Sequence, residues 1–545
     1  MARDRWLLAA VLLLAGGLAW HARFVLDDAF IVFQYARSLV EGDGLSWFGE
    51  RVEGYTNFGW VIWLALGFAL GAEPVAWSQA SGIAAFGFSV ALLWRIASDA
   101  AEGESALVPL VATLGFATNF SVHSFATGGL ATMAQTALVL ATFRSAQRCW
   151  DAPGGPRRHF ALASVWAALS LLVRLDSAVL LAPIGVWLLL SLRSVGRARR
   201  GDAVAALLVP VALIIGVWFG WKLLYYGSVL PNSFAAKLTG GGWVADGALQ
   251  WGRFVLWYGV GPLIALFTIQ AALAGKVPGR CGRAVLWVAS ALLASSFAYL
   301  TFAGGDFMEF RFLVPVAAYA YLALALLLDA GCARFGARGR GVVAAVTVSL
   351  LSLSSYAHSI TFHTDPDLRM DGIPQLGDFY GRYPDGAWDR IGSALARELA
   401  GTDAVIAVTA AGAIPYYSRL ESVDLWGLND RTIPTLGVVS EQRRPGHRYR
   451  ATFDYLRERG VQLIVGDPAL LTLEELRRAR IPALLRGWAA MAMPARLPGP
   501  DEMFVVAMPV EADTRLLLWV LQPNAAIERA ARDWRRWRIP YRPSE

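Results

Sequence analysis

Long apolar runs alternate with short polar links over the first two thirds of this sequence. A helix needs about 20 predominantly apolar residues to cross the hydrocarbon core of a bilayer. Because the backbone finds no water there, such runs cross only as helices, in which every N–H and C=O is paired. The runs predicted to cross are residues 6–23, 75–94, 106–122, 130–143, 160–173, 177–192, 203–224, 254–275, 284–302, 312–330 and 341–358. We therefore expect a polytopic α-helical membrane protein with about eleven spans.

The arginines indicate the orientation of these spans. Arginine-rich links follow every second span, for example around Arg144, Arg193 and Arg334. Short loops rich in arginine stay in the cytoplasm. The pattern is regular only if the short apolar run at 58–70 lies at the outer surface as an interfacial or re-entrant helix. Counted as a span, it would place all later arginine-rich links outside, so we expect a cytoplasmic N-terminus.

Composition excludes other classes of protein. Hydrophobic residues make up 56% of the chain and charged residues 17%, and the mean hydropathy is +0.45, values typical of membrane proteins and not of soluble enzymes. The net charge of +7 does not indicate nucleic acid, because the arginines cluster in links between spans. Cys149, Cys281 and Cys332 lie in or beside basic links without metal-ligand spacing. We expect them to be cytoplasmic and reduced.

The composition changes near residue 359, where long apolar runs end and prolines and charges increase. The predicted strands are 404–409, 461–465, 504–508 and 516–521, and the predicted helices are 387–399, 448–459 and 473–480. Strands that alternate with helices are typical of an α/β domain. The chain is thus divided into a transmembrane domain, 1–358, and a domain at 359–545 that an odd number of spans would place outside the cytoplasm.

Two adjacent acids, Asp27 and Asp28, follow the first span and precede an amphipathic helix predicted over residues 29–41. Ionisable groups at a membrane boundary are functional candidates by default. The alternative is a pair of solvated acids at a helix N-terminus, where aspartate is favoured. The sequence leaves both interpretations open.

Other polar motifs are expected on the same, outer side of the membrane. They are 53–57, 123–132, 174–176, 225–233 with Lys237, and 304–311. Acids, cations, aromatics and glycines that converge at span ends are what a site at the membrane–water boundary needs. Each motif also has an ordinary structural explanation, such as snorkelling by Lys237 and Arg311 or an ion pair between Arg174 and Asp176.

The chemistry that fits these residues is displacement of a lipid-linked phosphate by an acceptor hydroxyl. A carboxylate would act as general base, and a cation would hold the charge of the leaving phosphate. Direct displacement inverts the anomeric centre, with the base opposite the leaving group. An apolar, aromatic groove near 58–70 would seat the lipid chain.

These stretches resemble the GT-C superfamily of polyprenyl-phosphate-dependent glycosyltransferases, and within it the mycobacterial terminal β-(1→2)-arabinofuranosyltransferases and their proteobacterial relatives. The matching stretches are DDAFIVFQYARSLVEGDGL at 27–45, ERVEGYTNFGW at 50–60, YYGSVLPNSFAAK at 225–237, GGDFMEFRFLVP at 304–315, GAIPYYS at 412–418 and VDLWGLNDRTI at 423–433. The resemblance implies a GT-C fold with juxtamembrane helices in the first outer loop and a C-terminal extracytoplasmic domain. It also implies a polyprenyl-phosphate donor that carries arabinofuranose.

The resemblance further implies site residues. Asp27 or Asp28 is the expected general base. Donor-phosphate ligands are expected at Arg311, Lys237, Tyr225, Tyr226 and Asn232. Sugar or acceptor ligands are expected at Glu53, Tyr55, Asn57, Asp306, Tyr416, Tyr417, Asp424, Asn429 and Asp430. No cofactor is implied with certainty, and a divalent cation stays an open alternative.

The expected reaction is transfer of a sugar to an envelope glycan, lipid or protein at the outer side of a bacterial cytoplasmic membrane. A transporter or flippase of lipid-linked sugar is the alternative from another class, although transporters usually carry repeat symmetry and polar residues at mid-membrane. A non-enzymatic envelope scaffold is a third. Within the enzyme class, transfer of mannose or aminoarabinose is the alternative to arabinofuranose.

Overall fold

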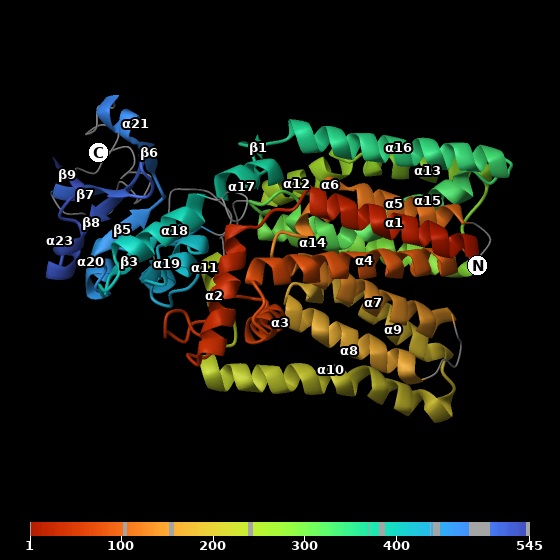
Figure 1. Ribbon diagram of the computed structural model, residues 1–545. Coiled ribbons are helices and arrows are strands. Elements are labelled where there is room, and N and C mark those ends of the chain that lie inside the picture. The colour runs from red at the N-terminus through yellow and green to blue at the C-terminus, as the bar shows by residue number, and fades with distance from the viewer. Residues whose placement is uncertain are drawn as a thin grey trace.

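The computed structural model describes residues 2–101, 106–151, 157–237, 244–368, 370–380, 387–436, 438–439, 447–478 and 502–540. Figure 1 shows a long helix bundle with a smaller part, built on a β-sheet, at one of its ends. The N-terminus and the link between the ninth and tenth helices lie at the opposite end of the bundle. The predicted fold class, a helical membrane part followed by a sheet-containing domain, is confirmed.

The bundle contains most of the helices of the chain. In order they are α1 (Ala2–His21), α4 (Pro74–Ala100), α5 (Leu107–Thr118), α6 (Phe120–Phe125), α7 (Thr132–Asp151), α8 (Arg157–Val173), α9 (Ser177–Ser191), η1 (Leu192–Ser194), α10 (Arg197–Tyr226), α12 (Val244–Trp257), α13 (Val260–Ala274), α14 (Arg280–Ala303), η2 (Arg311–Leu313), α15 (Val314–Gly331) and α16 (Ala337–Thr361). Their lengths reflect the apolar runs of the sequence, because each run must bury its backbone polar groups in helical hydrogen bonds.

The predicted number of eleven spans is not confirmed. Within the described ranges, six helices are long and apolar enough to cross a membrane, or seven if α12 and α13 form one span. The run predicted to cross at 254–275 includes the end of α12 and all of α13, and the chain bends by 69° between these two helices. Gly259, which lies between them, has a φ of +69° that ends a right-handed helix. The span predicted at 106–122 is interrupted at Asn119, which separates α5 from α6.

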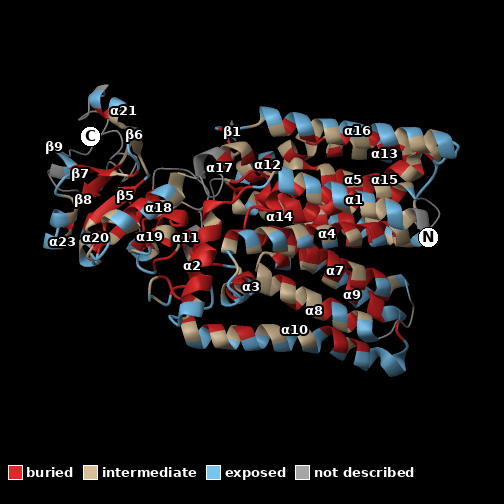
Figure 2. Ribbon diagram, viewed as in Figure 1, coloured by how far each residue is buried: buried red, intermediate tan, exposed pale blue. Residues whose placement is uncertain are grey.

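Burial distinguishes the inside of the bundle from its outside (Figure 2). In the most apolar stretch of η2 and α15, 83% is buried inside the protein, whereas in the most apolar stretch of α10 only 17% is buried. The helices packed against α15 include α5, α13 and α14. Apolar side chains on α10 point outward, for example Val217 and Leu224, which are 72% and 91% exposed. A helix that is apolar on its outward face suits contact with lipid, so the chain is a multi-pass membrane protein.

Two helices that follow α1 in the sequence lie at the sheet side of the bundle. Helix α2 (Asp27–Glu41) runs across the end of the bundle in Figure 1. It confirms the helix predicted over 29–41, which in fact begins at the acidic pair. Helix α3 (Phe58–Ala69) has 12 residues, too few to cross a bilayer, as expected for the run at 58–70.

The C-terminal part is built on one sheet. Its strands are β3 (Val405–Val408), β4 (Glu421–Asp424), β5 (Leu463–Gly466), β6 (Leu470–Thr472), β7 (Glu502–Pro509), β8 (Thr514–Val520) and β9 (Arg535–Pro540). Their order is β4-β3-β5-β8-β7-β9, with β6 also paired to β8. β3 is parallel to β4 and β5, and the other pairs are antiparallel. The four predicted strands are confirmed as β3, β5, β7 and β8.

Short helices and a hairpin complete this part. They are α17 (Ile373–Tyr380), α18 (Ala387–Glu398), α19 (Ala413–Ser418), η3 (Ile433–Leu436), α20 (Phe453–Glu458), α21 (Leu473–Arg478), α23 (Ala525–Ala530) and the antiparallel pair of β1 (Thr364–Asp365) and β2 (Met370–Asp371). A further short helix, α11 (Asn232–Lys237), lies between α10 and α12 in the chain. The helix predicted at 387–399 is confirmed, and the one predicted at 473–480 is confirmed to Arg478, after which its last two residues lie outside the described ranges. The one predicted at 448–459 begins later, because the Thr452 hydroxyl accepts a hydrogen bond from the Tyr455 N–H and caps α20.

Candidate active site

The acidic pair occupies the first turn of α2, where negative charge interacts favourably with the helix dipole. Its two carboxylates have different surroundings. The Asp27 residue is 7% exposed, whereas the Asp28 side chain is 35% exposed. Adjacent residues on a helix point in different directions, so one acid faces the sheet domain and the other a polar cluster of the bundle.

Asp27 binds the start of α19. Its Oδ2 accepts the Gly412 N–H at 3.0 Å and its Oδ1 accepts the Ala413 N–H at 2.7 Å. A Cβ on residue 412 would lie 2.5 Å from the Asp27 carboxylate, so only glycine allows this approach. Both carboxylate oxygens are occupied by backbone donors, which favours a structural role for Asp27 over the predicted role of base.

Burial raises the pKa of Asp27 to about 7, while the backbone hydrogen bonds from Ala413 and Gly412 oppose the rise. The folded carboxyl therefore binds its proton more tightly than the unfolded one, whose pKa is near 3.9. The contribution to stability is full below about pH 4 and is lost as the pH rises through about 7.

We expect an Asp27→Asn variant to lose this part of the pH dependence, because an amide does not titrate. The stability advantage of the wild type over the variant should shrink between pH 4 and pH 7, by at most about 1.4 kcal/mol per pH unit. Thermal unfolding of both proteins in detergent across that range measures the difference. A difference that stays constant with pH would contradict the assignment.

Asp28 faces Arg311. The Asp28 Oδ2 lies 4.0 Å from the Arg311 NH1. Arg311 is itself fixed by Asp306, because its Nε and NH2 donate to the two carboxylate oxygens at 2.7 and 3.0 Å. A bidentate pair of this kind is strong and fixes the guanidinium plane. The third nitrogen is thereby directed to Asp28, so the structure brings Asp28, Asp306 and Arg311 together.

Gln250 on α12 holds the loop that carries Asp306, a role that the sequence did not predict. Its Nε2 donates to the Asp306 C=O at 2.7 Å, and its Oε1 accepts the Asp306 N–H at 2.9 Å. Gly305 has a φ of +87°, and a Cβ there would lie 2.9 Å from the Gln250 carboxamide. In the sequence, the double glycine Gly304-Gly305 before Asp306 indicated that another group approaches the backbone closely here, because glycine has no Cβ to prevent it.

A second ion pair, between Arg174 and Asp176, lies beside this cluster. The Arg174 Nε and NH2 donate to Asp176 at 3.0 and 2.5 Å, which confirms the predicted ion pair. Gln135 also donates to Asp176, at 2.9 Å. The guanidinium groups of Arg174 and Arg311 lie over the ring of Phe312, 5.5 and 5.0 Å from its centroid. Two arginines, each bonded to an aspartate, therefore meet at Phe312.

The motif at 53–57 packs against the middle of α2, where the Gly54 N–H donates to the Tyr35 hydroxyl at 3.2 Å. Glu53 forms an ion pair with Lys222 of α10, with 2.7 Å between Oε2 and Nζ, and the two side chains are 4% and 1% exposed. Burial raises the pKa of Glu53, and the Lys222 ammonium opposes the rise. Asn57 precedes α3 as its N-cap residue, without a side-chain cap bond.

The tyrosines predicted for the phosphate belong to this second group. The Tyr55 and Tyr226 hydroxyls are 2.9 Å apart, and Tyr226 donates to the Leu45 C=O at 2.9 Å. Tyr225 stacks on Trp221 with 5.2 Å between ring centroids. This group contacts α2 at Tyr35, whose ring lies 4.8 Å from that of Tyr55, and Tyr35 is roughly 10 Å along the helix axis from Asp28 at 1.5 Å per residue. The Lys237 side chain lies outside what the structure describes.

The remaining candidates are engaged in internal contacts. Asn232 donates to the carbonyls of Gly427, Leu428 and Asp430, each at 2.9 Å. Asp424 accepts the Trp426 N–H and two bonds from Asn429. Asp430 accepts the Tyr455 hydroxyl at 2.6 Å.

Tyr416 and Tyr417 lie where α19 meets α2. The Arg37 guanidinium lies 4.3 Å from the ring centroid of Tyr416, and the Tyr417 ring is 5.4 Å from that of Phe30. These contacts fix the sheet domain to the bundle. Across the described ranges, no three histidine, cysteine, aspartate or glutamate side chains gather in a way that could hold a metal ion.

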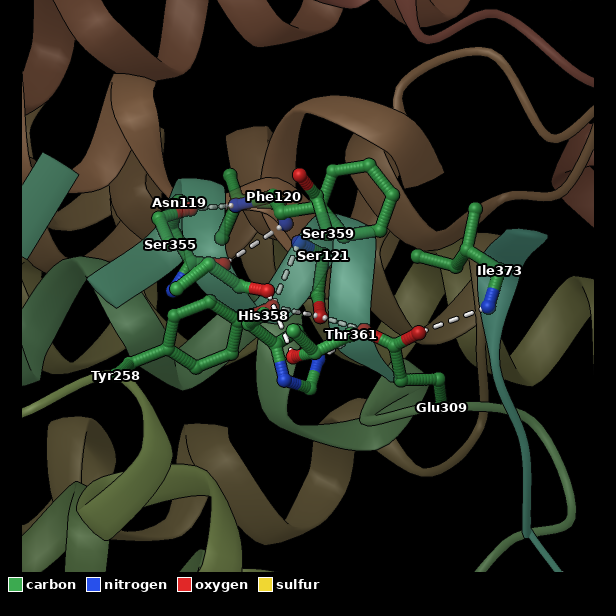
Figure 3. Close-up of polar contacts among 12 residues, drawn as sticks. Asn119, Phe120, Ser121, Tyr258, Glu309, Ser355, His358, Ser359, Thr361 and Ile373 are labelled. Carbon is green, nitrogen blue, oxygen red and sulfur yellow. Dashed lines mark hydrogen bonds and ion pairs between the residues drawn. The ribbon is translucent and has the colours of Figure 1, made fainter. Parts of the chain in front are cut away.

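A buried polar network lies behind the Arg311 loop (Figure 3). Glu309, two residues before Arg311, accepts hydrogen bonds from the Ser121 hydroxyl at 2.7 Å and from the Ile373 N–H at 2.8 Å. Its Oε1 also lies 2.9 Å from the His358 Nε2. Glu309 thus ties the loop to α6, α16 and α17, a role that was not predicted from the sequence.

Comparison with known proteins agrees with this architecture. A family model described as a domain of unknown function (DUF8728) matches residues 380–513. Terminal β-(1→2)-arabinofuranosyltransferases of Mycobacterium tuberculosis and Corynebacterium glutamicum are each 29% identical to the chain, over 46% and 54% of its length. These alignments cover only 40% and 46% of the relatives' own lengths.

Solved structures share the fold over nearly the whole chain. ArnT from Cupriavidus metallidurans bound to undecaprenyl phosphate has a TM-score of 0.54 at 14% identity and covers 95% of this chain and 98% of its own. The arabinofuranosyltransferase AftD from mycobacteria has a TM-score of 0.51 at 15% identity, covering 95% of this chain and 40% of its own. The chain therefore has the GT-C fold and is similar in sequence, over about half of its length, to the terminal β-(1→2)-arabinofuranosyltransferases.

Proposed function

We propose that the chain is an inverting glycosyltransferase that moves arabinofuranose from a polyprenyl-phosphate donor to a hydroxyl of an envelope glycan, lipid or protein. The observation that carries the proposal is the pairing of a half-exposed carboxylate, Asp28, with a guanidinium, Arg311, that a second carboxylate holds in place. The sequence similarity to arabinofuranosyltransferases supports the sugar. The undecaprenyl phosphate bound by ArnT supports the class of donor.

In this reaction Asp28 is the general base. Its side chain is 35% exposed and, in the part of the chain that the structure describes, forms an ion pair with Arg311. A carboxylate that is open to solvent on one side can accept the proton of an incoming hydroxyl. Asp27, with both oxygens bonded to backbone N–H groups, is assigned to docking of the sheet domain.

Arg311 is the group that holds the donor phosphate. As the glycosidic bond breaks, the phosphodiester becomes a monoester and gains negative charge, which a fixed cation stabilises. Asp306 and Gln250 fix Arg311 before the donor arrives. In an inverting displacement the base and the leaving group lie on opposite faces of the sugar. The sugar would therefore lie between the Asp28 carboxylate and the phosphate on Arg311, and the two side chains, now 4.0 Å apart, would separate when the donor binds.

The other predicted ligands have positions that favour support of the fold. Glu53, Tyr55, Tyr225 and Tyr226 link α10 to the loop after α2, and Asn232, Asp424, Asn429 and Asp430 build the connection to the sheet domain. We propose an outer location for the site and for residues 359–545, in agreement with the position of the N-terminus at the far end of the bundle.

The test is transfer by the purified chain in proteoliposomes. Radiolabelled polyprenyl-phosphoryl-arabinofuranose is supplied with an arabinan oligosaccharide, and the product linkage is determined by NMR. We expect a new β-linked terminal residue and release of polyprenyl phosphate. Movement of the intact lipid-linked sugar across the bilayer without a covalent product would instead identify a flippase and reject the proposal. Donors that carry mannose or aminoarabinose are tested in parallel to determine which sugar is transferred.

A further inference from the structure

A groove of about 520 Å³ lies between α1 and α16 and has α17 as its third side. Volumes of roughly 300–1,000 Å³ are typical of sites for small ligands. Leu14 and Leu18 of α1 line one wall, and Tyr356 and Ile360 of α16 line the other. We propose that this groove binds an anionic phospholipid of the surrounding bilayer. The proposal does not depend on the proposed transferase activity.

The groove opens toward the surface that faces lipid. Leu14, Tyr356 and Ile360 are 41%, 64% and 57% exposed, and each belongs to a helix at the outside of the bundle (Figure 1). Apolar side chains of this kind are stable in contact with acyl chains and not with water. An occupant can therefore enter sideways from the bilayer, with its acyl chain against the apolar walls.

The end of the groove beside the last turn of α1 is basic. His21 and Arg23 line it and are exposed. Arg23 is fixed there, because its guanidinium donates to the Trp20 C=O at 3.1 Å and lies 4.6 Å from the Trp20 ring centroid. Exposed tryptophan is typical of the membrane–water interface, where headgroups lie. None of the described lining residues is acidic, so the charge of the groove favours an anionic headgroup over a zwitterionic one.

The groove shares residues with the network behind Arg311. Phe120, Ser355 and Ile373 line the groove. The Phe120 N–H donates to the Ser355 hydroxyl at 2.7 Å, and the Ile373 N–H donates to Glu309 at 2.8 Å (Figure 3). A lipid in the groove would therefore stabilise the elements that hold the loop of Glu309 and Arg311.

The test uses the full chain in nanodiscs of phosphatidylcholine that contain a graded fraction of phosphatidylglycerol. Lipids that stay bound to the protein are counted by native mass spectrometry. Arg23→Gln removes the headgroup cation, and Leu18→Trp fills the groove. The matched controls are Arg283→Gln, which removes an exposed arginine in the first turn of α14, and Leu13→Trp, at a residue that is 79% exposed and outside the groove.

We expect wild-type chain to retain phosphatidylglycerol in preference to phosphatidylcholine. Arg23→Gln should weaken this retention about fivefold, the effect of losing one cation near anionic headgroups. Leu18→Trp should abolish it, and both controls should retain it. Equal retention of the two lipids by the wild type, or an equal loss in the matched controls, would overturn the proposal. So would preferential retention of added undecaprenyl phosphate over phosphatidylglycerol.

The same experiment separates this site from the transferase site. Asp28→Asn should bind phosphatidylglycerol as the wild type does, because Asp28 does not line the groove. Loss of binding in that variant would contradict a separate lipid site. A negative result in the transferase assay, in contrast, would not alter the conclusion about lipid binding.

Discussion

Replacing Asp28 with asparagine is expected to lower sugar transfer by about 10²–10⁴-fold, the usual contribution of a general base. Asparagine has nearly the same shape but cannot accept the proton of the acceptor hydroxyl. The fold should be unaffected, because the side chain is 35% exposed and its ion pair with Arg311 is long, and exposed pairs contribute about 0–1 kcal/mol. Initial rates in proteoliposomes and thermal unfolding in detergent measure the two effects separately.

Two further variants test whether the loss of transfer is specific to Asp28. Glu41→Gln makes the same chemical change at the last residue of α2, where the side chain is 46% exposed and pairs with Arg419 at 3.5 Å, and it should keep full turnover. Asp27→Asn should lower the unfolding temperature, because it disturbs the two hydrogen bonds to the start of α19. If Asp28→Asn keeps turnover while a folded Asp27→Asn protein loses it, the general base is Asp27.

Replacing Lys222 with methionine is expected to destabilise the protein by about 3–5 kcal/mol, the cost of leaving a buried charge without its partner. Glu53 would remain 4% exposed without the ammonium that lies 2.7 Å away. The variant should show a large fall in unfolding temperature and in the fraction that elutes as a single species from a sizing column.

A double variant separates the loss of the ion pair from the loss of packing. Glu53→Met combined with Lys222→Met replaces the pair by apolar groups of similar volume, so most of the stability should return. Arg390→Met is the exposed control: its ion pair with Glu511 is also 2.7 Å long, but the side chains are 45% and 44% exposed, and about 0–1 kcal/mol should be lost. Additive effects of the two single changes at 53 and 222 would show that these residues are not coupled.

The individual assignments of Asp27 and Asp28 required the fold. The sequence marked both as one motif, because each is an acid in the first turn of the same helix. Which carboxylate binds backbone N–H groups depends on residues 412 and 413, more than 380 positions away along the chain. Likewise, the sequence does not distinguish Gln250 from other polar residues of an amphipathic helix. Its role depends on the contact with the Asp306 loop, which only the folded structure shows.

The sequence by itself determined the helical membrane part, the change of composition near 359 and the central strands β3, β5, β7 and β8. Apolar run length and period-two patterns are local properties, and the backbone must form hydrogen bonds wherever water is excluded. The edge strands β4 and β9, the bend between α12 and α13 and the pairing of Asp28 with Arg311 were decided only by tertiary structure. These features depend on contacts between distant segments, whose free energy exceeds the local preferences of the residues involved.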